Sequence, residues 1–109
     1  MMTTFHTPAP SELTHAHREA MARIQSLAIT ISQQGTHAVS TEYAGHIHEF
    51  SAHTLRFSEI AKGNFKADIT LRVLLPGCLA FAGDNALAEL NAMALELEAL
   101  LVTVKGGVA

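Results

Sequence analysis

The spacing of apolar residues changes twice along this chain, and that pattern constrains the fold more than any other feature. Residues 11–34 and 84–105 repeat apolar residues at intervals of three and four, the spacing of an amphipathic helix. Residues 36–75 contain shorter runs rich in β-branched residues, separated by turn residues, which is typical of strands. The sequence therefore predicts an α+β fold of order α-β-β-β-α, with an antiparallel sheet and two long helices packed on one face.

The first helix is expected to begin at Ser11, a favourable N-cap, and to end near Gln34, with Gly35 as its stop. Its buried side is predicted to carry Leu13, His17, Ala20, Met21, Ile24, Leu27, Ala28 and Ile31. His17 is the one residue of this stripe that is not apolar. We therefore expect it to lie at the edge of the core, with hydrogen-bond partners for its ring nitrogens. Residues 1–10 are expected to form a flexible arm.

Three strands are expected, over residues 36–43, 46–57 and 66–75. A two-residue turn at Ala44-Gly45 would join the first two and place Tyr43 opposite His46. Apolar and polar residues alternate along the third strand, so its apolar side chains should face the core: Ile69, Leu71, Val73 and Leu75. Its polar side chains should face solvent: Asp68, Thr70 and Arg72. A polar loop is expected at 58–64. Residues 78–82 would form an edge strand or a loop, so the sheet has three strands or four.

The chain has 109 residues, of which 49% are hydrophobic and 16% charged, with six aromatic residues and no Trp. This length predicts one domain with an aliphatic core, which we assign to residues 11–105, followed by a frayed C-terminus at 106–109. A domain this small buries a limited fraction of its surface. The apolar content therefore favours a homo-oligomer.

The second helix, expected from an Asp84 cap to Lys105, is apolar on both sides. Its predicted core stripe consists of Leu87, Leu90, Met93, Ala94, Leu97, Leu100, Leu101 and Val104. The opposite side, where a surface helix would carry charge, consists of Ala88, Ala92, Leu95, Ala99 and Val102. One interpretation is an alanine-rich helix of high propensity. We favour an oligomer interface, because Leu95 and Val102 are larger than propensity requires.

Four of the seven histidines lie within residues 36–57, and His46 and His48 form an H-x-H pair. On a strand, this spacing would place both imidazoles on one face, where they could hold zinc or another divalent transition metal. A third ligand is lacking, because His37 would lie roughly 20 Å away and Glu42 and Glu49 would face the other side. We therefore expect ordinary strand histidines. A metal site completed by another element or subunit, and a pH-dependent interface, are the alternatives.

The sequence contains no pattern that points to catalysis. It lacks a G-x-S-x-G motif, and Gly77–Gly83 lacks the lysine and glycine spacing of a phosphate-binding loop. Cys78 has no basic neighbour and is expected to be a small buried hydrophobe. Glu96 and Glu98 are expected on different sides of the helix and solvated. We therefore predict a protein that is not an enzyme and has no cofactor.

The predicted element order resembles that of double-stranded RNA-binding domains, which place lysines near the start of the second helix. This chain has Gly83–Asn85 there, followed by Glu89, Glu96 and Glu98, and its net charge is −3. Acidic residues repel phosphates, so no nucleic-acid partner is expected.

The expected location is the cytoplasm. No apolar stretch is long enough to span a membrane, and the N-terminus lacks the features of a signal peptide. A single cysteine cannot form an internal disulfide.

These observations favour a small interaction module of accessory, adaptor or inhibitor type. It would bind another protein, whose identity no residue reveals, and self-associate through the second helix. A metal-binding protein using His46 and His48 is the alternative, and a small-ligand pocket between sheet and helices is a third hypothesis.

Overall fold

The structure is a computed structural model that describes residues 13–77 and 85–102. Its elements are α1 (His15–Gln33), β1 (His37–Ala44), β2 (Glu49–Arg56), α2 (Phe57–Ile60), β3 (Ile69–Leu74) and α3 (Ala86–Glu98). The expected N-terminal arm, the segment 78–82 with Cys78, Lys105 and the C-terminal residues 106–109 lie outside the described residues.

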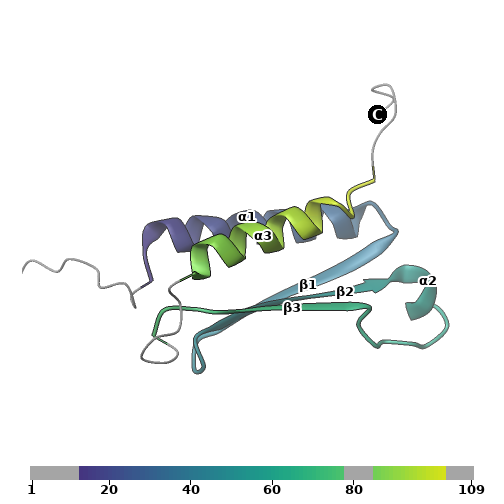
Figure 1. Cartoon of the computed structure of the whole chain (residues 1–109). Helices are drawn as coiled ribbons and strands as arrows, with labels where there is room; N and C mark the ends of the chain where they lie inside the picture. Colours follow the sequence, from purple (N-terminus) through teal and green to yellow (C-terminus); the bar gives the residue numbers. More distant parts are fainter. Residues whose placement is uncertain (1–12, 78–84, 103–109) are drawn as a thin grey trace, which may run out of the picture.

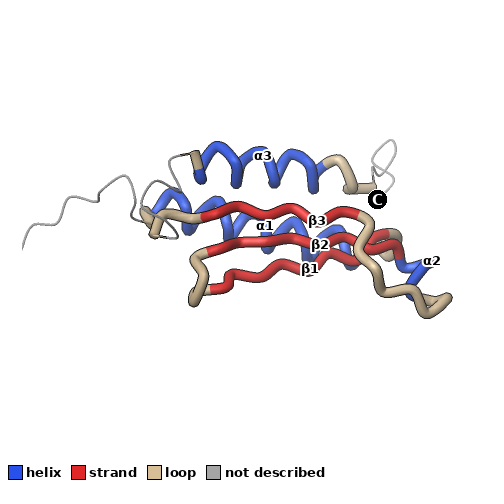
Figure 2. The backbone as a smooth tube through the Cα atoms, turned by 60° about the horizontal axis from the view of Figure 1, so that its bottom comes forward, coloured by secondary structure: helices blue, strands red, loops and turns tan. Residues whose placement is uncertain are grey.

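The three strands form one antiparallel sheet in the order β1-β2-β3. α1 and α3 lie side by side on one face of this sheet and run in the same direction (Figure 1). Figure 2 is turned toward the other face, which no helix of the described chain covers. The predicted α+β fold is confirmed. The short helix α2 is an addition, because the sequence predicted only a polar loop at 58–64.

The core lies between the two helices and the covered face of the sheet. Its fully or nearly buried apolar residues are Ala20, Ile24, Ala28, Ile31, Phe50, Ala52, Val73, Leu75, Ala86, Leu90, Met93, Ala94 and Leu97. The predicted stripe of the first helix is confirmed. In α3, Leu87 was predicted to be buried, but it is 36% exposed and Ala86 is buried in its place.

α1 begins at His15, and the prediction of a start at Ser11 is wrong. Thr14 is the N-cap: its hydroxyl accepts a hydrogen bond from the His17 N–H, at 3.4 Å. In return, Nδ1 of His17 accepts one from the Thr14 N–H, at 3.0 Å. This reciprocal pair is a capping box with histidine at the position usually held by Glu or Gln. The predicted end is confirmed, since Gly35 has a φ of +86°.

A four-residue turn over residues 45–48 joins β1 to β2, so the predicted two-residue turn is wrong. Tyr43 faces Phe50 instead of His46. This shift is even, so the side chains of the strands keep their predicted faces. The predicted register would have placed His46 and His48 on the helix-covered face, where burying polar imidazoles without partners is costly. The longer turn moves both histidines out of the sheet.

β3 is shorter than the predicted 66–75, but its alternation is confirmed. Val73 and Leu75 are buried and Leu71 is half-buried, whereas Thr70 and Arg72 are exposed. Ile69, at the end of the strand, departs from the prediction and is 40% exposed.

α3 has Asn85 as its N-cap and ends at Glu98, so the prediction that it continues to Lys105 is wrong. The side-chain amide of Gln34, at the end of α1, holds the backbone of Val102. Its Oε1 accepts from the Val102 N–H at 2.7 Å, and its Nε2 donates to the Val102 carbonyl at 3.2 Å. These contacts replace the hydrogen bonds that a continuing helix would have made.

Candidate functional site

The outward side of α3 carries the five residues that the sequence predicts as an oligomer interface. Ala88, Ala92, Leu95 and Ala99 repeat at intervals of four and three, and Val102 follows just after the helix. All five are exposed, with Leu95 at 64% and Val102 at 46%. They lie opposite the residues with which α3 fills the core. We call this set the α3 stripe.

Acidic side chains border the α3 stripe. Helical spacing places Glu89 and Glu96 along one margin and Asn91 and Glu98 along the other. The Glu98 carboxylate accepts a hydrogen bond from Arg23 of α1, so the prediction that it is simply solvated is wrong. No Lys or Arg lies within α3 itself. A surface that packs against the α3 stripe therefore meets an uncharged strip with one acidic margin, at Glu89 and Glu96, and a second margin where Glu98 is paired with Arg23.

His46 and His48 lie exposed in the turn between β1 and β2. His48 has a left-handed backbone, with φ +50°, and its carbonyl accepts a hydrogen bond from the Leu75 N–H at 2.8 Å. Its ring lies against Gly77, where an added Cβ would be 3.6 Å from Nδ1. The expectation that a strand aligns the two imidazoles is therefore wrong. Among residues 13–77 and 85–102, no three His, Cys, Asp or Glu residues are arranged to hold a metal ion.

The other two histidines of this region lie apart from the turn, which confirms the prediction for His37. His37 is at the far end of β1, opposite Arg56. His53 faces the uncovered side of the sheet, where its Nδ1 lies 3.2 Å from Oγ1 of Thr70. The four histidines therefore do not form one cluster.

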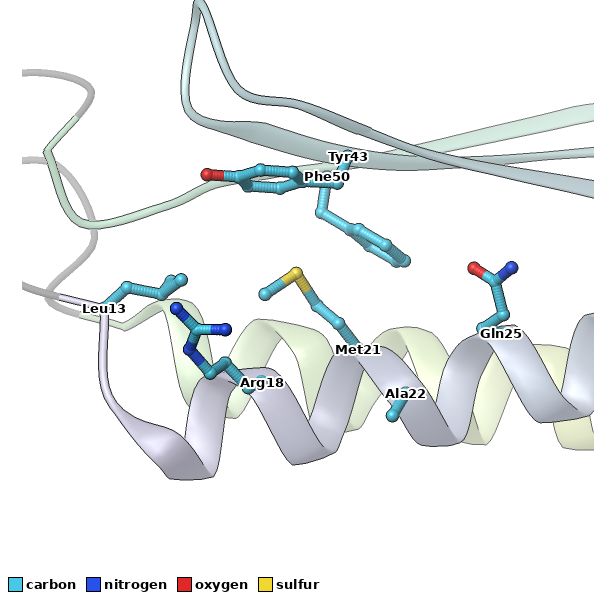
Figure 3. A pocket seen from close by; sticks show the side chains of 7 residues that line it. All are labelled: Leu13, Arg18, Met21, Ala22, Gln25, Tyr43 and Phe50. Atoms are coloured by element: carbon cyan, nitrogen blue, oxygen red, sulfur yellow. The ribbon is translucent and has the colours of Figure 1, made fainter.

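A groove runs between α1 and β1, on the helix-covered side of the sheet (Figure 3). One part of it is a cavity of about 460 Å³, lined by Leu13, Arg18, Met21, Ala22, Gln25, Tyr43 and Phe50. Met21 and Phe50 form its apolar middle. The Arg18 guanidinium and the Tyr43 hydroxyl lie at the end beside Leu13, and Gln25 lies at the other end.

A second cavity, of about 480 Å³, continues the groove along β1. It is lined by Gln25, Ala28, Ile29, Ser32, Gln33, Val39, Ser40 and Thr41. The hydroxyl of Thr41 donates to Oε1 of Gln25, at 2.9 Å, where the two cavities adjoin. The groove thus lies in the region of the third hypothesis, between sheet and helices. Sequence reasoning did not identify its residues, because Arg18 and Gln25 look like ordinary surface positions of an amphipathic helix.

The most organised charged contacts lie around α2, away from the groove. The Glu59 carboxylate accepts from Nδ2 of Asn64 at 3.1 Å and from Nζ of Lys62 at 3.3 Å. These two hydrogen bonds lower the pKa of Glu59. Nε of Arg56 donates to Asp68 at 3.0 Å, and this bond raises the pKa of the guanidinium. Both sets of contacts hold the connection between β2 and β3 in place.

Comparison of the chain with protein-family models, curated proteins and solved structures gave no match. Within the part of the chain that the structure describes, none of the helices combines the length and the apolar character needed to cross a membrane.

Proposed function

We propose that this chain is a non-enzymatic protein-interaction module that self-associates through the α3 stripe. One observation carries the proposal: Leu95 is 64% exposed at the centre of an uncharged helical strip, opposite the side of α3 that fills the core. A large aliphatic side chain gains about 1.5–3 kcal/mol when it is fully buried. A second copy of the same strip would supply that burial.

The small residues of the α3 stripe suit this partner. Ala88, Ala92 and Ala99 let a second helix approach closely, and Leu95 of each copy can pack into the space beside the alanines of the other. A two-fold contact of this kind closes on itself and yields a discrete dimer.

The acidic margin formed by Glu89 and Glu96 predicts how salt affects this assembly. In any pairing of two copies, Glu89 and Glu96 meet only neutral or acidic residues of the other α3, so electrostatic repulsion opposes association. Salt screens this repulsion, because the Debye length falls from about 30 Å at 0.01 M to about 8 Å at 0.15 M. Self-association should therefore strengthen with salt, whereas binding to a basic partner would weaken.

The experiment is light scattering coupled to size-exclusion chromatography at micromolar protein. We expect a dimer or larger assembly for the wild type and a monomer for the double variant Leu95→Glu, Val102→Glu. Ile29→Glu is the matched control, because Ile29 is 54% exposed on α1 and lies outside the α3 stripe. A monomeric wild type would overturn the proposal.

Within this proposal, the module acts in the reducing cytoplasm by binding another protein, as an accessory, adaptor or inhibitor. Its single cysteine supports that compartment. The metal-binding alternative has two imidazoles in the described turn, His46 and His48, and no observation adds a third ligand to them.

A further inference from the structure

The direction of the backbone groups along β1 can be derived from one hydrogen bond. The Phe57 N–H donates to the Thr36 carbonyl at 3.0 Å, at the pair next to His37–Arg56 in the β1–β2 register. Because bonded and non-bonded pairs alternate in an antiparallel ladder, the even-numbered residues of β1 direct their backbone groups toward β2. The odd-numbered residues Val39, Thr41 and Tyr43 direct theirs away from it, to the open edge of the sheet.

α1 covers this edge at one point. Oγ of Ser32 accepts a hydrogen bond from the Val39 N–H at 2.9 Å and lies 3.5 Å from the Val39 carbonyl. At Thr41 and Tyr43, by contrast, no described residue bonds to the outward N–H or C=O groups. Unpaired backbone groups on an edge strand are a template for pairing with another chain. Here the unpaired groups belong to Thr41 and Tyr43, which follow Val39, the residue that Ser32 binds.

The first cavity of the groove lies beside these unpaired groups. Tyr43 belongs both to the open edge and to the cavity wall, and Met21 and Phe50 provide an apolar surface next to it (Figure 3). Among the described residues that line this cavity, Arg18 is the only charged one, and no carboxylate of residues 13–77 and 85–102 pairs with it. The site therefore offers backbone pairing, an apolar pocket and one cationic group.

We propose that an extended segment of another protein adds to β1 at Thr41–Tyr43 as a fourth strand. One large apolar side chain of this segment occupies the cavity over Met21 and Phe50, and a carboxylate on the same face of the segment binds Arg18. Side chains at i and i+2 of a strand share a face, so the ligand carries its apolar and acidic residues two positions apart. This surface is separate from the α3 stripe and does not depend on self-association.

Charge favours such a ligand over a second copy of this chain. If two copies paired through Thr41 and Tyr43, the two-fold arrangement would place Glu42 directly opposite Glu42 of the second copy. Like charges at directly opposite positions destabilise a strand pair. A segment that supplies a carboxylate to Arg18 and no acidic residue opposite Glu42 avoids this repulsion.

The experiment is a selection of phage-displayed random decapeptides against the full chain, followed by fluorescence anisotropy with the enriched peptide. We expect enriched sequences to place an acidic residue two positions from a large apolar one. Arg18→Gln should weaken binding at least about tenfold, the order of magnitude expected when a hydrogen bond to a charged group is lost. Arg72→Gln, at the opposite edge of the sheet, is the matched control and should leave the affinity unchanged. Failure to enrich such peptides, or equal effects of the two substitutions, would overturn the proposal.

Backbone pairing is tested separately. Thr41→Pro removes the outward N–H, and proline is tolerated on an edge strand where the N–H faces solvent. It should weaken binding at least tenfold, whereas Thr41→Val keeps the N–H, loses only the Gln25 contact and should bind within about threefold of wild type. If Thr41→Pro fails to fold, the peptide N-methylated at its pairing amides gives the same test on the unchanged protein. Equal binding of the methylated and parent peptides would contradict the strand addition.

Strand addition at β1 can be tested independently of self-association through the α3 stripe. The same titration with the Leu95→Glu, Val102→Glu variant should give the wild-type affinity for the peptide, whatever the oligomeric state of the protein. Loss of peptide binding in that variant would place the ligand on the α3 stripe instead of β1.

Discussion

His17 holds the first turn of α1 through a ring nitrogen that accepts hydrogen bonds. Its Nδ1 takes the Thr14 N–H at 3.0 Å and lies 2.8 Å from the Thr14 hydroxyl, and the residue is only 8% exposed. Because the Thr14 hydroxyl in turn accepts the His17 N–H, each residue satisfies a backbone donor that the first turn of the helix would otherwise leave free.

His17→Leu should lower the free energy of unfolding by about 1 kcal/mol, because the Thr14 N–H loses its acceptor while the buried volume is kept. His17→Gln should cost less, since an amide oxygen can accept the same bond. Urea denaturation measures both values. His15→Gln, at an exposed neighbouring position, serves as the control and should change stability little. Equal stabilities of His17→Leu and the wild type would show that the capping box contributes nothing.

Glu59 makes the stability of the α2 region depend on pH. Hydrogen bonds from Asn64 and then Lys62 lower its pKa below the ordinary value of 4.5. A carboxyl whose pKa is lowered on folding stabilises the protein at pH values above its unfolded-state pKa. That contribution is lost as the pH falls through the folded-state pKa.

Glu59→Gln should therefore lose less stability than the wild type on acidification from near neutrality to below pH 4.5. Thermal melting at the two pH values measures the difference. Glu42→Gln, at an exposed position of β1 outside the α3 stripe, should keep the wild-type pH dependence. An unchanged pH dependence in Glu59→Gln would contradict the role of these hydrogen bonds.

At the scale of the elements, periodicity predicts which segments are helices and strands, whereas individual hydrogen bonds and the cost of burying polar groups decide where they begin and end. The stripe of α1 and the faces of β1, β2 and β3 follow from local spacing. The start of α1 depends on the Thr14–His17 pair, and the end of α3 depends on Gln34, distant in sequence. The hairpin turn has four residues instead of two, because a two-residue turn would have buried His46 and His48. Gln34 lies far from α3 in the sequence, so no local pattern predicts the end of that helix. The Thr14–His17 pair is local, but it has histidine where a capping box usually has Glu or Gln.

Gln34→Ala should remove the two hydrogen bonds that hold the backbone of Val102 after α3. We expect hydrogen exchange of the Val102 amide to become roughly 2- to 12-fold faster, which corresponds to one net hydrogen bond of about 0.5–1.5 kcal/mol. NMR-detected exchange measures this rate directly. Gln33→Ala, the exposed neighbour, should leave it unchanged. If both variants exchange alike, the end of α3 is set by something other than Gln34.

At the scale of the whole molecule, the helix-covered face of the sheet builds the core, and the two surfaces that we propose for binding lie at the borders of that core. The α3 stripe lies on the outward side of the helix layer, and the groove lies at the β1 edge. The sequence predicted the residues of the α3 stripe, because both sides of one helix can be read from its period. It could not predict the groove, because Arg18, Met21 and Tyr43 come together only through the packing of α1 on β1.

The central claim is that the α3 stripe joins two copies of this chain, and sedimentation velocity on the wild type tests it most directly. Measurements over a micromolar concentration series, at salt concentrations of about 0.05 M and about 0.5 M, vary both concentration and screening. We predict a concentration-dependent shift from monomer to dimer or larger, and a shift at lower protein concentration in the higher salt. A single monomeric species at every concentration and both salt concentrations would contradict the account.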